Sequence, residues 1–169
     1  MNRKQFIGII SLWLIIIFGL IGYKQLTIVT GTTVLLETVP VDPRDIFRGD
    51  YVTLNYAISD YDTLPFSGTE RGVNVQSGDT IYVVLQLENG VGVPQYKTLN
   101  RPDNQLFIKG RVTGYESEYT NYAIEYGIES YFVPEGEGKD IERARGRNLY
   151  TQVSIDKNGN AVITDISFQ

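Results

Sequence analysis

One uncharged apolar segment near the N-terminus constrains this chain more than any other feature of its sequence. Phe6 to Tyr23 reads FIGIISLWLIIIFGLIGY, 18 residues without a charged side chain. As a helix it would be about 27 Å long, close to the ~30 Å hydrocarbon core of a bilayer. Arg3 and Lys4 precede it and Lys24 follows it, so the positive charge lies mainly on its N-terminal side. The segment predicts a single transmembrane anchor, with the N-terminus inside and the rest of the chain outside.

A cleaved signal peptide is the competing interpretation of this segment. The apolar region of a signal peptide is normally about 7–15 residues long and ends in a small-x-small cleavage site. Here the apolar run is longer, and Gly19 to Tyr23 contains no Ala-x-Ala pattern. We therefore expect an uncleaved anchor over residues 1–24 and one exported domain over residues 25–169. The domain would lie in the periplasm or outside the cell.

Charge and composition narrow the function of the exported part. Residues 25–169 carry 12 basic and 20 acidic side chains. Such a surface repels phosphates, so we expect no nucleic-acid partner, and no contact with anionic lipid except where the anchor forces the domain close to it. The chain has no cysteine and no histidine. Cysteine nucleophiles, Ser-His triads and thiolate or imidazole metal sites are therefore excluded.

Beyond the anchor, apolar and polar residues alternate with a period of two, and Gly, Pro, Asn and Asp interrupt the pattern. Short alternating runs predict half-buried strands. About eight short strands imply an all-β fold, either a sandwich or a partly open barrel. The expected strands lie in residues 32–39, 51–58, 80–87, 92–99, 105–115, 121–133 (bent at Gly127), 149–155 and 161–168.

The connections between these runs carry their own signals. Asn89-Gly90 and Asp156 to Asn160 are typical of hairpin turns. Ser59 to Asn74 shows no period, which predicts a long loop. Lys139 to Arg145 is the one helix-like stretch after the anchor.

The window from Val39 to Tyr56, VPVDPRDIFRGDYVTLNY, holds the densest cluster of unusual residues. Asp42 is a favoured N-cap and Pro43 falls at the first helical position, which predicts one or two helical turns over Pro43 to Arg48. Gly49 is placed to end them. A well-capped corner between two strands accounts for these residues without any further function.

Two arginines in this turn are not needed for capping. Arg44 and Arg48 are spaced i, i+4 and would share one helical face. They would bind a carboxylate of a partner protein or pair locally with Asp45 and Asp50. These four residues are therefore candidates for partner binding as well as for local ion pairs.

Two motifs resemble the signatures of the GDYXXLXY protein family. Gly49 to Tyr56 (GDYVTLNY) fits the name-giving pattern at every fixed position, and Tyr126 to Gly136 (YGIESYFVPEG) resembles the second signature. The resemblance covers nearly all of the exported part. It implies a bacterial or archaeal membrane-anchored protein of unassigned activity, whose relatives often occur alongside multi-span membrane proteins. The motif residues that we add to the partner-binding candidates are Tyr51, Tyr56, Glu129 and Tyr131.

An exported carbohydrate-binding module or a carboxylate-based hydrolase is the alternative function. A carbohydrate-binding module would need an exposed platform of tyrosines for stacking on sugar rings. The tyrosines that would test this idea are Tyr51, Tyr61, Tyr82 and Tyr96.

The residues for hydrolysis or metal binding show no recognisable constellation. Asp60 and Asp62 alternate in a loop and are typical of turns, and Lys97 and Lys109 show no apolar context that would lower a lysine pKa. The acidic residues around the second motif match no metal-binding loop, so ordinary ion pairing is the simpler interpretation. We expect no catalytic residue, no metal and no cofactor.

These observations together predict a single-pass membrane protein whose exported domain binds a partner. The bilayer is contacted through Phe6 to Tyr23. The second partner is a membrane protein or a component of a surface assembly, to which the chain would be an accessory subunit.

Overall fold

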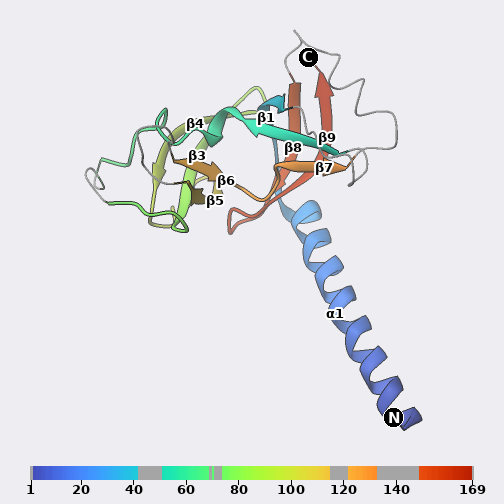
Figure 1. Ribbon diagram of the computed structural model, residues 1–169. Coiled ribbons are helices and arrows are strands. Elements are labelled where there is room, and N and C mark those ends of the chain that lie inside the picture. The colour runs from blue at the N-terminus through green and yellow to red at the C-terminus, as the bar shows by residue number, and fades with distance from the viewer. Residues whose placement is uncertain are drawn as a thin grey trace.

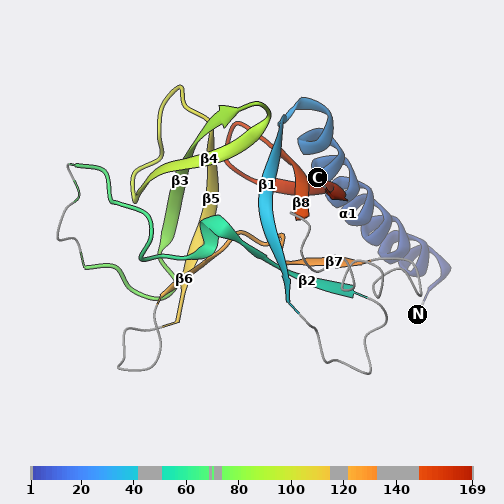
Figure 2. The same ribbon diagram turned by 90° about the horizontal axis from the view of Figure 1, so that it is seen from above.

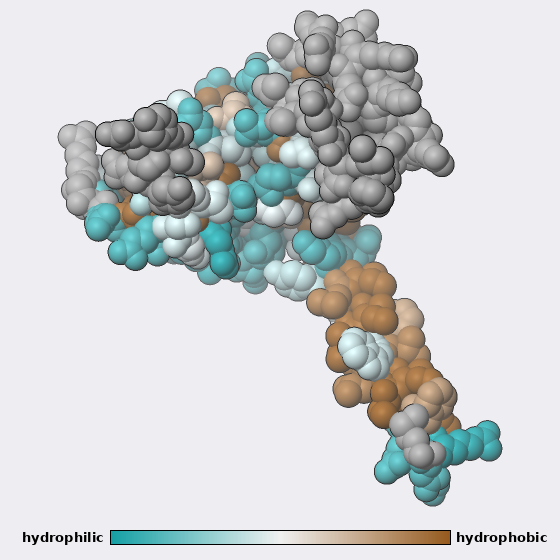
Figure 3. Space-filling view, in the orientation of Figure 1, coloured by the Kyte–Doolittle hydropathy of each residue, from teal (hydrophilic) through white to brown (hydrophobic). Residues whose placement is uncertain are grey.

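The computed structural model describes residues 2–41, 51–68, 70, 74–114, 122–132 and 149–168. One long helix projects from a head built of strands (Figure 1). This helix, α1 (Arg3–Thr30), has 28 residues and is therefore about 42 Å long. We call α1 the stalk. Its apolar side chains are exposed along its length, and its free end is hydrophilic (Figure 3). Within the described residues, α1 is the one helix long and apolar enough to be a candidate membrane span.

The helix continues beyond the apolar segment and leads almost directly into the sheet. It passes Lys24, where the sequence suggested that the anchor ends, and reaches Thr30. Gly31 ends it, and the Gly31 N–H still donates to the carbonyl oxygen of Thr27 at 3.0 Å. The first strand starts at Thr32, so one residue separates the stalk from the head. This short connection leaves little freedom between the two.

Nine strands form the head within the described residues. Their order in the sheet is β6-β5-β3-β4-β1-β2-β7, and β8 and β9 branch from β1. All pairings are antiparallel except the single parallel contact between β1 and β4. The strands are β1 (Thr32–Val41), β2 (Tyr51–Tyr56), β3 (Thr80–Glu88), β4 (Val91–Thr98), β5 (Phe107–Thr113), β6 (Ala123–Glu125), β7 (Ser130–Phe132), β8 (Leu149–Ile155) and β9 (Ala161–Phe168).

The sheet curls into a half-barrel, as the view from above shows (Figure 2). β1 is central to it because β1 pairs with β8 along Thr32 to Thr38 and with β2 along Thr38 to Val41. The prediction of an all-β fold of partly open barrel type, preceded by one N-terminal helix, is confirmed.

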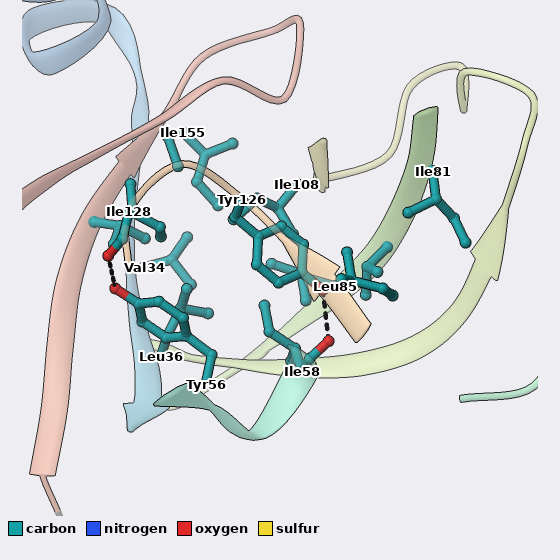
Figure 4. Packing of buried hydrophobic residues seen from close by; sticks show 14 of the residues in the cluster. Val34, Leu36, Tyr56, Ile58, Ile81, Leu85, Ile108, Tyr126, Ile128 and Ile155 are labelled. Atoms are coloured by element: carbon teal, nitrogen blue, oxygen red, sulfur yellow. Dashed lines mark hydrogen bonds between the residues drawn. The ribbon is translucent and has the colours of Figure 1, made fainter. Parts of the chain in front are cut away.

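One hydrophobic core fills the curl of the sheet (Figure 4). The alternation in 51–58 predicted its members correctly, since Leu54, Tyr56 and Ile58 are all buried. The other large side chains that are almost completely buried come from β1, β3, β5, β6 and β8, and they are Val34, Leu36, Ile81, Val83, Ile108, Val112, Ile124, Leu149, Val153 and Ile155.

The turns lie where glycine and asparagine predicted them. Asn89 and Gly90 both have positive φ, 52° and 88°, as a tight hairpin between β3 and β4 requires. Gly127 also has a positive φ of 78° and separates β6 from β7, which confirms the expected bend within 121–133.

The loop predicted over Ser59 to Asn74 is held against the sheet in its described part. A short 3₁₀ helix, η1 (Ala57–Ser59), begins it. Asp60 then forms an isolated antiparallel bridge with Ala123, and Phe66 forms a parallel bridge with Lys97. The loop is therefore part of the fold. The helical turn predicted for 43–48 and the helix-like stretch 139–145 lie outside the described residues.

Candidate functional site

The two segments that carry the family-like motifs lie side by side. β2, from the first motif, pairs antiparallel with β7, from the second, with Tyr51 opposite Phe132 and Thr53 opposite Ser130. The Leu54 N–H extends this contact by donating to the carbonyl oxygen of Glu129 at 2.8 Å. Residues about 75 positions apart in the sequence thus form one structural unit.

Two buried tyrosines lock this unit together. The Tyr56 hydroxyl donates to the carbonyl oxygen of Ile128 at 2.6 Å, and the Tyr126 hydroxyl donates to the carbonyl oxygen of Ile58 at 2.5 Å. Each motif therefore supplies a phenol that binds the backbone of the other motif's segment (Figure 4). The arrangement gives two buried carbonyl groups a hydrogen-bond donor. Without a donor, each buried carbonyl group would lower the stability of the fold.

The electrostatics of the pair keep both phenols neutral. Burial, followed by the negative charge of Glu129, raises the pKa of Tyr56 and of Tyr126 above the ordinary value for tyrosine. Glu129 itself is half-buried, and its carboxylate accepts the backbone N–H of Tyr126. These groups act as hydrogen-bond donors and acceptors within the head.

The eight candidate partner-binding residues have different positions in the molecule. Tyr56 is 2% exposed, so its side chain belongs to the core. Glu129 and Tyr131 are half-buried next to it. Tyr51 contributes its backbone to the β2–β7 pairing. Arg44, Asp45, Arg48 and Asp50 lie outside the described residues.

A shallow pocket of about 310 Å³ lies between β7, β9 and the stalk. The candidate residue Tyr131 lines it beside Phe132, whose side chain is 73% exposed. Its remaining lining residues come from the stalk, from the segment between β6 and β7, and from the starts of β7 and β9, and they are Lys24, Gly127, Ile128, Ser130, Ala161, Val162 and Ile163. We call this the β7–β9 pocket.

The stalk is hydrogen-bonded to the β8–β9 hairpin of the head. The Ser154 hydroxyl donates to the carbonyl oxygen of Thr27 at 2.8 Å, and the Asn160 side-chain amide donates to the Tyr23 hydroxyl at 3.0 Å. Gly31 makes this approach possible, because a β-carbon there would lie 2.3 Å from the Ser154 hydroxyl oxygen. Sequence periodicity did not indicate these contacts.

Lys97 corrects one expectation drawn from the sequence. It is 3% exposed, and its ammonium nitrogen lies 3.4 Å from the centre of the Tyr61 ring and 4.7 Å from that of Phe66. The ammonium group also donates to the carbonyl oxygen of Tyr61. Burial lowers the pKa of Lys97, and the charges of Asp62 and Asp60 partly oppose this shift. The expectation that Lys97 has no apolar context is therefore wrong.

Lys97 fastens the described part of the 59–74 loop to β4. Asp60 accepts the backbone N–H of Asp62 in a tight turn, as its alternating spacing suggested. Phe66 and Tyr61 pack edge to face, with ring centres 6.0 Å apart, over the lysine. This is a cation enclosed by aromatic rings and backbone, an arrangement that stabilises a loop.

A second buried charge holds the same loop further along. The Glu70 carboxylate accepts the backbone N–H of Leu99 at 2.9 Å and the side-chain amide of Asn100. Burial alone would raise the pKa of Glu70, but these hydrogen bonds, with one from Thr98, lower it overall. Glu70 is thus an anchor for the end of β4.

Two of the tyrosines considered for sugar stacking, Tyr61 and Tyr96, lie on different surfaces. Tyr61 faces Lys97 on the inner side of β4, whereas Tyr96, the residue before Lys97, points to the outer side and donates its hydroxyl to Gln105 at 2.7 Å. Tyr82 packs edge to face on Phe107, with ring centres 5.5 Å apart. Tyr61 and Tyr96 therefore cannot form a single platform.

A search for metal sites covered the described part of the chain. No group of three or more Asp and Glu side chains there is arranged to hold a metal ion. Asp156, the most elaborately bonded carboxylate, accepts the backbone N–H groups of Asn158 and Asn160 and closes its own turn.

Comparison with known proteins supports the motif reading. The sequence model of the GDYXXLXY protein family matches residues 13–166. Searches of curated proteins and of solved structures gave no match. The match spans the last part of the stalk and nearly the whole head, including both tyrosines of the buried pair. The chain belongs to the GDYXXLXY protein family.

Proposed function

We propose that this protein is a membrane-anchored binding or assembly subunit whose head lies on the outer face of the cytoplasmic membrane. In this proposal the N-terminus is inside, α1 crosses the bilayer once, and the head docks on a membrane protein or a surface assembly. The chain has no catalytic role. The exposed apolar surface of α1 and the basic residues at its N-terminal end support this orientation.

The observation that carries the proposal is the hydrogen-bonded junction between stalk and head. A head on a long flexible linker would sample many positions above the membrane. Here one residue separates α1 from β1, and two hydrogen bonds from the β8–β9 hairpin hold the final turns of α1. The head is therefore presented in one orientation close to the bilayer, which suits a protein that docks on a membrane-embedded partner.

The β7–β9 pocket is the docking surface that this orientation favours. It lies directly beside the stalk, with Lys24 in its lining, so a partner within the same membrane reaches it without leaving the bilayer surface. Tyr131 and Phe132 supply aromatic side chains of the type that is enriched at protein interfaces.

Affinity purification of the full-length protein in mild detergent, followed by mass spectrometry, tests the proposal. A membrane protein should co-purify with the wild type and be lost from Phe132→Asp. Leu87→Asp is a matched control, because Leu87 is an exposed apolar residue (44%) on the distant strand β3. Recovery of no membrane protein with the wild type, or equal losses with both variants, would contradict the proposal.

A further inference from the structure

A second pocket lies under the head, on the side of the turn 156–160 that faces β5. It has a volume of about 380 Å³. Three cationic side chains line it, from α1 and β5, together with one carboxylate from β6. These residues are Lys24, Lys109, Arg111 and Glu125. We call this the basic pocket.

The fold explains why these cations meet. Lys109 and Arg111 are two positions apart on β5, so their side chains share its outer face, and both are exposed. The Lys109 backbone N–H donates to the carbonyl oxygen of Gly159 at 2.8 Å, which ties β5 to the β8–β9 turn. The same turn reaches the stalk through Asn160 and Tyr23. This chain of contacts brings the next stalk residue, Lys24, to the pocket wall.

The pocket is cationic in a protein that is otherwise acidic, with a formal net charge of −5. Its lining carries three positive charges and one negative charge. Within the described residues that follow the apolar segment, the other exposed basic side chains lie next to the same turn: Lys157 is part of it, and Arg101 donates to the Lys157 carbonyl oxygen at 2.8 Å. Within the described part of the head, exposed positive charge is thus concentrated where the head meets the stalk. Figure 3 shows hydrophilic residues on the underside of the head.

The position of the basic pocket relative to the bilayer suggests its ligand. Tyr23 ends the apolar segment and Lys24 follows, and both residue types favour the interface between hydrocarbon and water. The pocket therefore opens at the level of the lipid phosphates. Lysine and arginine side chains close to an anionic leaflet are attracted to its headgroups.

We propose that the basic pocket binds the phosphate of an anionic phospholipid headgroup, through Lys24, Lys109 and Arg111. This inference rests on the membrane anchoring proposed above. It refines the expectation that an acidic domain avoids anionic lipid, because the avoidance does not hold for the one face that the stalk places against the membrane. A bound lipid would fix the rotation of the head about the stalk as well as its height.

Native mass spectrometry of the full-length protein tests this proposal. The detergent-purified protein is exchanged into phosphatidylcholine containing a minor fraction of phosphatidylglycerol, and the retained lipids are counted. The wild type should retain phosphatidylglycerol in preference to phosphatidylcholine. Lys109→Gln/Arg111→Gln should weaken that preference at least about tenfold, since each basic residue near an anionic surface contributes appreciably.

A matched control tests whether the change in net charge alone explains a weaker lipid preference. Gln86→Glu/Gln95→Glu changes the net charge by the same amount at exposed positions on β3 and β4, and it should keep the wild-type preference. Equal weakening in both variants, or a wild type without preference for phosphatidylglycerol, would overturn the proposal. Loss of retained phosphatidylglycerol on adding equimolar inorganic phosphate would show a site for free phosphate, and would overturn it too.

The outcome can be separated from that of the proposed function. A protein that stays in membranes after an alkaline wash and still co-purifies with its partner, yet shows no lipid preference, would leave the docking function standing and reject the lipid site. A protein released by the wash would reject the anchor, and the lipid site with it.

Discussion

Tyr56 and Tyr126 each donate a hydrogen bond to the backbone of the other's segment, and their rings meet edge to face with centres 6.5 Å apart and planes at 85°. Tyr56 is the last residue of the name-giving motif, and Tyr126 is the first of the second motif. The two motifs are therefore two halves of one clasp in the core. The hydroxyl groups of Tyr56 and Tyr126 thus have a structural role in this clasp.

Removal of either phenol oxygen should destabilise the head. Tyr56→Phe and Tyr126→Phe each leave a buried carbonyl group without its donor, which we expect to cost about 1–2 kcal/mol in the free energy of unfolding. Denaturant unfolding of the full-length protein in detergent, followed by circular dichroism, measures this. The loss in free energy of unfolding of the double variant should differ from the sum of the two single losses, because the effects of substitutions at residues in contact are not additive.

Tyr82→Phe is the control for this pair. Tyr82 is half-buried and packs on Phe107, and within the described residues its hydroxyl has no hydrogen bond. Its loss should change stability by less than about 0.5 kcal/mol. If Tyr82→Phe were as destabilising as Tyr56→Phe, the clasp would not be the cause.

Truncation of Lys97 should loosen the 59–74 loop. Lys97→Ala removes three buried methylene groups, the ammonium group and its contact with the Tyr61 and Phe66 rings, and we expect a loss of about 2–3 kcal/mol. Lys97→Met keeps the volume and removes a buried charge, so its stability should stay within about 1 kcal/mol of the wild type. Thermal or denaturant unfolding separates the two variants, and equal losses would show that the charge matters more than the packing.

The lowered pKa of Lys97 also predicts that the protein becomes more stable as the pH rises into the alkaline range. Because its pKa is lowered in the fold, the unfolded chain binds more protons between that lowered value and the ordinary value of 10.5. The free energy of unfolding contributed by Lys97 therefore increases as the pH rises through this window. Lys97→Met should lack the increase, and a variant with the wild-type pH profile would contradict the assignment.

The lowered pKa of Glu70 predicts a loss of stability at acidic pH. Its pKa is lowered from 4.5, so its contribution is complete above that pH and is lost as the pH falls through the lower value of the folded state. Glu70→Gln should cost about 1–2 kcal/mol near neutral pH and should flatten the profile below pH 4.5. Unfolding curves at a series of acidic pH values measure this, and an unchanged slope would refute it.

Gly159 should be sensitive to any side chain. It has a φ of 80°, and a β-carbon there would lie 2.6 Å from the Phe107 ring and 2.9 Å from the Lys109 backbone nitrogen. Gly159→Ala should therefore cost about 2–3 kcal/mol, since backbone strain and a steric clash combine. Gly90→Ala is the matched control: its φ is 88°, but nothing lies within 4 Å, so about 1 kcal/mol is expected. Similar losses in the two variants would show that the clash is relieved.

The sequence was most informative where local patterns decide the structure. Alternation predicted the strands and the buried face of Leu54, Tyr56 and Ile58, and glycine with asparagine predicted the turn at Asn89-Gly90. The length of the apolar segment predicted the stalk. Each of these signals depends on neighbours within a few residues.

Lys97 shows why the same reasoning failed elsewhere. Leu85 pairs with Pro94 but Val84 pairs with Tyr96, so β4 contains one extra residue, Gln95. Such a bulge reverses which residues face inward, and it places Lys97 in the core opposite Val83. Strict alternation continued from the buried Gly92 would have placed this lysine outside. A bulge depends on the partner strand, and a single sequence does not show its position.

The clasp and the basic pocket were missed for a related reason. Tyr126 is separated from Ile58 by 68 positions and Lys24 from Lys109 by 85, and only the sheet order brings them together. Lys109 and Arg111 are two positions apart in the expected strand 105–115, and this spacing was the one available sign of the pocket. The predicted roles of Arg44, Asp45, Arg48 and Asp50 remain predictions.

The junction at Gly31 links the direction of the stalk to the orientation of the head. In the proposed arrangement, where α1 crosses a bilayer, one connecting residue and two hydrogen bonds would make the half-barrel follow any tilt of the helix. A bilayer that becomes thinner than the apolar segment favours tilt. In that arrangement, membrane thickness, or contact of a neighbouring span with the helix, would set the sideways position of the head's far rim.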